Sequence, residues 1–179
     1  HKVARNCANK RLSYGNLTFF HCNNMSLSSA LQKWDGKSTN TLNCVFETYV
    51  ESPNFADNIV QLMQSNRSAI AASWLLKRFL EKKHELSVEL QKIVLSELSL
   101  NSHWQTQLHI LQSLPYLDIS LAGKTQIYSY LRYAISAENK FVKAWAYNGF
   151  YLLSCVYREY IDEAQACLNL AMETEPASV

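Results

Sequence analysis

The chain has few of the residues that interrupt regular structure, since only 4 of its 179 residues are glycine and 3 are proline. Four glycines leave little material for the glycine-rich loops that hold phosphate groups in nucleotide-binding proteins. The sequence also lacks an uncharged apolar run of about 18 residues, which a membrane-spanning helix requires. Nucleotide-binding folds are therefore disfavoured, and we expect neither a membrane span nor a membrane partner.

Signature motifs of common enzymes are absent as well. The sequence contains no GxSxG and no HExxH, and His103 and His109 are six residues apart, which places them on different sides of a helix. Cys155 and Cys167 fall at positions with core spacing, so we predict that both are buried small side chains. We therefore predict a protein without enzymatic activity, with no catalytic residue, no cofactor and no metal site.

The cysteines and the charges restrict the compartment and the partners. Five cysteines, an odd number in no recurring spacing, indicate reduced thiols and a cytoplasmic protein. Residues 1–24 carry four basic and no acidic side chains, whereas residues 25–179 carry the other 13 basic and all 15 acidic ones. Because nucleic-acid affinity comes largely from neutralised phosphates, this balance counts against a nucleic-acid partner.

The first 24 residues show no helical period and no apolar stretch typical of a secretory signal. We expect a poorly structured or non-native extension, followed by a helical repeat domain over residues 25–179. A transit peptide and a natural start at Met25 are alternative interpretations of the same segment.

From Ser26 onward the apolar residues recur at helical spacing, and no segment shows the alternation of a strand. Ser38 is placed to cap a helix that stops before Pro53. The spacing predicts further helices near 54–64, 66–82, 86–100, 102–114, 121–136, 139–157 and 160–173. The predicted fold class is all-α.

Apolar positions also repeat at long range. At an offset of 37 residues, three positions coincide at each of four places: Leu90, Ile127 and Ala164; Ile93, Tyr130 and Cys167; Val94, Leu131 and Leu168; Leu98, Ile135 and Met172. A shared register across loops indicates repeated helix pairs that bury their apolar stripes by stacking. The predicted repeats lie near 54–84, 85–119 and 120–158, with a partial repeat at 159–179.

One segment carries a family resemblance. Residues 138–150 resemble the turn and second helix of HEAT repeats, in which an acidic turn precedes a Val-Arg pair and a small residue follows the Val by four positions. Val142, Lys143 and Ala146 take these places, whereas the preceding copy has Trp104 and Gln105 at the Val-Arg place. The resemblance implies a short α-α superhelix of the HEAT or armadillo type, a solenoid of antiparallel helix pairs.

A tetratricopeptide-like repeat is the rival interpretation. Ala164, Leu168, Ala171 and Pro176 have the spacing of the second helix of that repeat. The period near 37 residues exceeds the roughly 34 of the tetratricopeptide family, so the HEAT-like interpretation is preferred.

The predicted binding site is a column on the second helices, which line the concave face in HEAT-like proteins. Aligned in register, it contains Trp74, Arg78, Gln105, His109, Lys143, Tyr147 and Tyr151. Aromatic faces beside cations suit an extended peptide or another helix. The alternative is that Trp74 and Tyr147 are core aromatics. Seven tyrosines between positions 128 and 160 are more than burial requires, so some are expected at the surface.

The functional prediction is a non-enzymatic interaction or scaffold module with a protein or peptide partner. The alternative is a DNA binder that resembles the HEAT-like glycosylases of DNA alkylation repair. We also expect that the helix near 160–173 leaves an apolar flank open to self-association, with Leu168 either exposed on that flank or buried.

Overall fold

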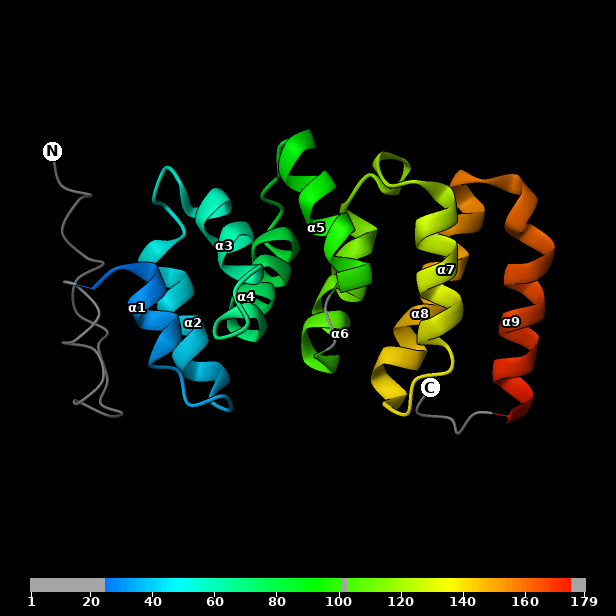
Figure 1. Cartoon of the computed structure of the whole chain (residues 1–179), viewed down its shortest axis with the longest axis horizontal. Coiled ribbons are helices and arrows are strands. Elements are labelled where there is room, and N and C mark those ends of the chain that lie inside the picture. The colour runs from blue at the N-terminus through cyan, green and yellow to red at the C-terminus, as the bar shows by residue number, and fades with distance from the viewer. Residues whose placement is uncertain (1–24, 101–102, 175–179) are drawn as a thin grey trace, which may run out of the picture.

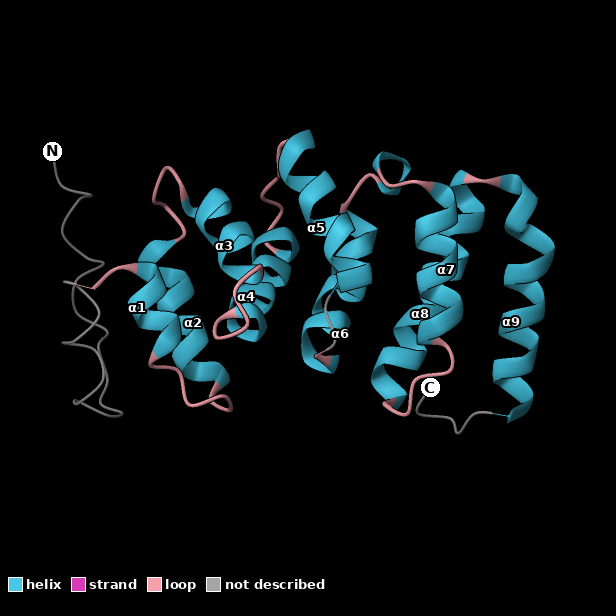
Figure 2. Cartoon of the chain, viewed as in Figure 1, coloured by secondary structure: helices cyan, strands magenta, loops and turns pink. Residues whose placement is uncertain are grey.

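The computed structural model describes residues 25–100 and 103–174, and all of its regular elements within these ranges are helices (Figure 2). The all-α prediction is confirmed for this part of the chain. The α-helices are α1 (Leu27–Gln32), α2 (Thr39–Tyr49), α3 (Phe55–Met63), α4 (Ala69–Glu81), α5 (Val88–Leu100), α6 (Trp104–Ser113), α7 (Lys124–Ala134), α8 (Lys140–Val156) and α9 (Ile161–Thr174). Short 3₁₀ helices are η1 (Leu114–Tyr116), η2 (Ile119–Leu121) and η3 (Arg158–Tyr160). The predictions for residues 1–24 and for the terminal segment 175–179 lie outside the described residues.

Side-chain caps set the starts of several helices. Ser38 accepts a hydrogen bond from the Thr41 N–H and begins α2, as the sequence predicts. Asn139 accepts from the backbone N–H groups of Phe141 and Val142 and begins α8. Such caps satisfy donors that have no partner inside the helix, and each contributes about 1 kcal/mol.

Successive pairs of helices follow one another in chain order along the long axis of the molecule (Figure 1). The even-numbered helices contact each other in sequence, α2 with α4, α4 with α6 and α6 with α8. The odd-numbered helices α3, α5 and α7 also contact in sequence, and each packs on the following even-numbered helix. The described chain therefore forms two adjacent rows of helices.

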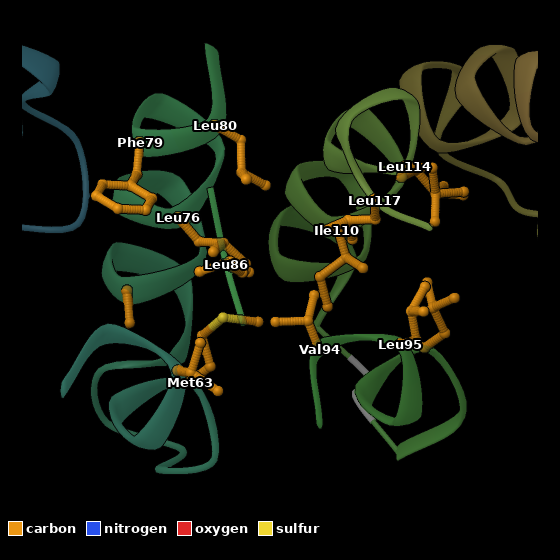
Figure 3. Packing of buried hydrophobic residues seen from close by; sticks show 14 of the residues in the cluster. Met63, Leu76, Phe79, Leu80, Leu86, Val94, Leu95, Ile110, Leu114 and Leu117 are labelled. Atoms are coloured by element: carbon orange, nitrogen blue, oxygen red, sulfur yellow. The ribbon is translucent and has the colours of Figure 1, made fainter. Parts of the chain in front are cut away.

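One continuous apolar core lies between these rows. Figure 3 shows a section of it, with Leu76 and Leu80 of α4 on one side and Val94 of α5 and Ile110 of α6 on the other. In α8, Val142 and Ala146 of the HEAT-like pattern are fully buried, as is Phe150 one turn further along the helix. The pattern thus marks core positions of this helix.

The helices α7 and α8 approach each other closely at one glycine. A Cβ added at Gly149 would overlap the end of the Leu131 side chain, which is itself fully buried. Glycine therefore lets the backbone of α8 come close to α7, although glycine inside a helix costs about 1 kcal/mol relative to alanine.

Most positions of the 37-residue repeat lie in the core or at its edge. Ile127, Tyr130, Leu131 and Ala164 are buried, and Leu90 is partly buried against the core. Met172 is the exception, with 85% of its surface exposed. The repeat register therefore describes the packing well in the middle of the chain and fails at the last turn of α9.

Candidate functional site

Five residues of the predicted column reach the surface to different extents. Trp74, Arg78, Gln105 and Lys143 are partly exposed, and Tyr151 is exposed. Trp74 and Arg78 lie on α4, Gln105 on α6, and Lys143 and Tyr151 on α8. Because α4, α6 and α8 contact in sequence, these side chains lie along neighbouring helices rather than in one compact cluster.

His109 and Tyr147 do not face outward. Only 9% of His109 and 7% of Tyr147 is exposed, so the expectation that they belong to an accessible strip is wrong. The physical reason is that α6 packs between α4 and α8, which buries the flanks of α6 and of its neighbours. Tyr147 is a core aromatic, which is the alternative that the sequence left open.

His109 joins two helices through a buried polar contact. Its Nδ1 lies 2.9 Å from the Ser73 hydroxyl oxygen of α4, and that hydroxyl donates to the Ile70 carbonyl at 3.0 Å. Because the hydroxyl has a single proton, Nδ1 of His109 acts as the donor to Ser73. Burial, and secondly the positive charge of Lys77, lower the pKa of His109 from 6.5 to about 4. The imidazole is therefore neutral at pH 7 and holds α6 against α4.

The cations of α4 are already engaged with neighbouring side chains. The Lys77 ammonium lies 5.7 Å from the centre of the Trp74 ring and 3.6 Å from a carboxylate oxygen of Glu81. An Arg78 nitrogen lies 3.8 Å from the other Glu81 oxygen. Exposed ion pairs of this kind contribute at most about 1 kcal/mol, so a ligand could displace them at small cost.

A pocket lies beside this row, where the start of α6 meets the connection between α7 and α8. Its volume is about 620 Å³, and it is lined by Trp104, Gln107, Tyr133, Ser136, Ala137, Glu138, Asn139 and Val142. The pocket therefore joins residues that are about thirty positions apart in the sequence.

Two aromatic side chains of the pocket lining are accessible. Trp104 is 42% exposed and Tyr133 is 67% exposed, which are large values for aromatic residues in contact with a packed domain. Val142, which is fully buried, and Gln107, of which 8% is exposed, also belong to the lining. The lining thus combines aromatic and apolar side chains with the polar ones of Gln107, Ser136, Glu138 and Asn139, and a combination of apolar and polar groups is a general feature of ligand-binding sites.

The charge of the pocket comes from one side chain. Glu138 is the only Asp, Glu, Lys or Arg among the lining residues, and it is exposed. Its carboxylate forms no ion pair with any residue in the described ranges. The nearby Lys140 ammonium lies 5.3 Å from the centre of the Phe141 ring, and neither residue lines the pocket.

Two features of the sequence pointed to single residues of this pocket. Trp104 takes the place at which the next copy of the HEAT-like pattern has the buried Val142. Such a departure indicates that the Trp104 side chain has a role other than packing in the core. The excess of tyrosines correctly predicted surface aromatics, since Tyr133 and Tyr151 are exposed and Tyr130 is buried. Neither signal showed that Trp104 and Tyr133 share one pocket.

Within the described residues no group of three or more His, Cys, Asp or Glu side chains is arranged to hold a metal ion. Cys167 is buried as predicted, whereas the prediction for Cys155 is wrong, because it lies on the exposed side near the end of α8. Among the helices of residues 25–100 and 103–174, none has the length and apolar character needed to cross a membrane.

Comparison with protein-family models, with curated proteins and with solved structures gave no match to this chain. Its function is therefore argued from its own residues.

Proposed function

We propose that this chain is a non-enzymatic protein interaction module that binds a polypeptide segment along its even-numbered helices. The observation that carries the proposal is the pocket between α6 and the α7–α8 connection, in which Trp104 and Tyr133 are both accessible. Tryptophan and tyrosine contribute much of the binding energy in protein interfaces, because they bury large areas at a low cost in conformational entropy.

The proposed architecture is a short HEAT-like solenoid. The contacts of α3 with α4, α5 with α6 and α7 with α8, and those of each pair with the next, support this interpretation. The tetratricopeptide-like alternative would use the same helix pairs, so the function proposed here does not depend on the choice between them. The cytoplasm is the proposed compartment, since Cys44, Cys155 and Cys167 are free.

The accessible members of the predicted column extend the proposed surface. Gln105 lies directly after Trp104, and Lys143 directly after Val142, and both Trp104 and Val142 line the pocket. Trp74, Arg78 and Tyr151 lie further away, on α4 and on a later turn of α8. A bound segment would use the pocket for one anchor side chain and these residues for its flanks.

DNA binding of the alkylation-repair type is the weaker alternative. The glycosylases of that family rely on an acidic residue beside an aromatic side chain within the groove, and Glu138 and Tyr133 do line the same pocket. No basic side chain lines the same pocket, whereas phosphate binding needs several. No observation favours this function over peptide binding.

A peptide selection tests the proposal. The full chain would be used to enrich a displayed random peptide library, and a Trp104→Ala/Tyr133→Ala variant would be used for counter-selection. We expect enriched peptides that bind the double variant at least about tenfold more weakly, since loss of one interface anchor typically costs 2 kcal/mol or more. Thermal unfolding of the variant would verify that it folds.

Tyr116→Ala is the matched control, because Tyr116 is also a half-exposed aromatic, at 46%, but does not line the pocket. Binding to this variant should equal binding to the original chain. The proposal fails if no peptide is enriched, or if the enriched peptides bind the double variant as tightly as they bind the original.

A further inference from the structure

The geometry points to an arginine side chain of the bound polypeptide as the occupant of the Trp104–Tyr133 pocket, with Glu138 as its counter-charge. This inference rests on the proposed function and names the chemistry that the pocket selects. It combines three features of the lining, namely two accessible aromatic rings, one carboxylate and no cation.

The aromatic pair accounts for attraction of a cation as well as of apolar groups. The face of a tryptophan or tyrosine ring carries negative electrostatic potential, so a cation near the ring is attracted to it. The chain already contains such contacts, with Lys77 near Trp74 and Lys140 near Phe141. In the pocket the two rings have no lysine or arginine beside them among the lining residues.

Glu138 supplies the charge complementarity. Its carboxylate makes no ion pair within the described part of the chain, and it lies in the same lining as the two rings. A bound cation would therefore gain a full opposite charge rather than compete with an existing partner. An anionic side chain would instead be repelled.

The helix ends near the pocket do not reverse this preference. The starts of α6 and α8 carry partial positive charge, and the end of α7 carries partial negative charge. Three of the N–H groups at the two starts are already used, because His103 Nδ1 accepts from Gln105 and Asn139 accepts from Phe141 and Val142. The backbone donors that would attract an anion are thus partly satisfied by the chain itself.

Arginine fits this combination of two aromatic rings and one carboxylate better than lysine does. Its guanidinium is planar, so it can stack on an aromatic ring and at the same time donate two hydrogen bonds to one carboxylate. Lysine offers a compact, strongly hydrated charge that loses more hydration in an aromatic pocket. The volume of about 620 Å³ also accommodates a long side chain together with part of its backbone.

The test uses small probes that differ in one group. N-acetyl-arginine methylamide would be titrated into the ¹⁵N-labelled full chain, with the indole N–H signal of Trp104 as the readout. N-acetyl-citrulline methylamide has the same shape but a neutral urea, and N-acetyl-lysine methylamide carries the other cation. The Trp104 signal is assigned from its loss in Trp104→Phe, and the Trp34 indole, which donates to the Ser38 carbonyl, is an internal control.

We expect the arginine probe to shift the Trp104 signal saturably and about 5- to 30-fold more tightly than the citrulline probe, with lysine in between. Glu138→Gln should abolish most of the difference between arginine and citrulline. Glu47→Gln, which removes an exposed carboxylate from α2, should leave it unchanged.

The outcomes separate this inference from the proposed function. Equal binding of arginine and citrulline, or tighter binding of lysine, would overturn the arginine assignment while leaving a pocket that binds polypeptide. The arginine assignment is likewise overturned, and the polypeptide-binding pocket retained, if no probe shifts the Trp104 signal but a selected peptide does. If neither the probes nor any selected peptide shifts Trp104, both the inference and the proposed function are wrong.

Discussion

At the scale of single residues, His109 shows how a polar side chain can serve packing rather than binding. Its position on α6, between the lysine-bearing face of α4 and the core, makes the charged imidazolium costly. The neutral ring is kept in place by Ser73, which is itself fully buried. This arrangement makes the stability of the described domain dependent on pH.

We predict that His109 lowers stability in mild acid. The pKa is about 4 in the folded chain and about 6.5 in the unfolded chain, so between these values the unfolded chain binds a proton that the folded chain does not. Stability is therefore fully present above pH 6.5 and falls as the pH decreases toward 4. One pKa unit corresponds to about 1.4 kcal/mol, so the total effect is about 3 kcal/mol.

His109→Gln isolates this contribution, because glutamine can still donate to Ser73 but takes up no proton. Urea unfolding at pH 7 and pH 4.5 should show that the loss of stability is about 2 kcal/mol smaller in this variant than in the original chain. His84→Gln removes an exposed histidine and should leave the original pH dependence in place. An unchanged pH dependence in His109→Gln would contradict the assignment.

At the scale of helices, the sequence predicted where elements lie better than which way their flanks point. Ser38, the stop before Pro53 and the apolar spacing located the helices, because caps, prolines and periodicity act over a few residues. The outward face was harder to predict, since adjacent residues of a helix point about 100° apart. An error of one position in the predicted outward face is therefore enough to predict a residue such as His109 or Tyr147 at the surface when it lies between helices.

The α9 helix exposes a different apolar residue from the one that the sequence analysis considered. Ala164 and Cys167 are buried against the domain, and side chains of α7 reach the helix, with the Tyr128 hydroxyl donating to Glu163 at 2.9 Å and Arg132 pairing with the same carboxylate. Leu168 is partly buried against the core, so it is not the outermost apolar residue. Met172 is instead the most exposed large apolar side chain in the described chain.

We predict that the surface of α9 around Met172 supports self-association, and that Met172→Lys weakens it. A charge at an exposed apolar contact disfavours association but removes little packing from the fold, so the melting temperature should stay nearly unchanged. Sedimentation velocity over a range of concentrations measures the effect. Gln165→Lys adds the same charge at another exposed position of α9 and should sediment like the original chain. Identical sedimentation of all three proteins would refute the predicted contact.

At the scale of the whole molecule, the site depends on how distant segments meet. Trp104 begins α6 and Tyr133 lies in the last turn of α7, and they line one pocket because α6 packs on α8, the helix that follows α7. The repeat pattern predicts stacked pairs but does not state the distance between such neighbours. For this reason the sequence could suggest a column of residues but not the pocket.

The order of the helices along the molecule determines which segments a bound polypeptide should protect (Figure 1). A polypeptide held at the pocket should protect the start of α6 and the connection between α7 and α8. It should have no effect on α1 and α2, which lie at the opposite end of the row from α8 and α9.

Hydrogen–deuterium exchange of the full chain, with and without a selected peptide, measures this protection directly. We predict slower amide exchange at residues 103–107 and 133–142 when the peptide is bound, and unchanged exchange at residues 27–49. The protection should be lost in the Trp104→Ala/Tyr133→Ala variant. Protection that is confined to α9, or that is equal in the original chain and the variant, would contradict the claim that this pocket is the binding site of an interaction module.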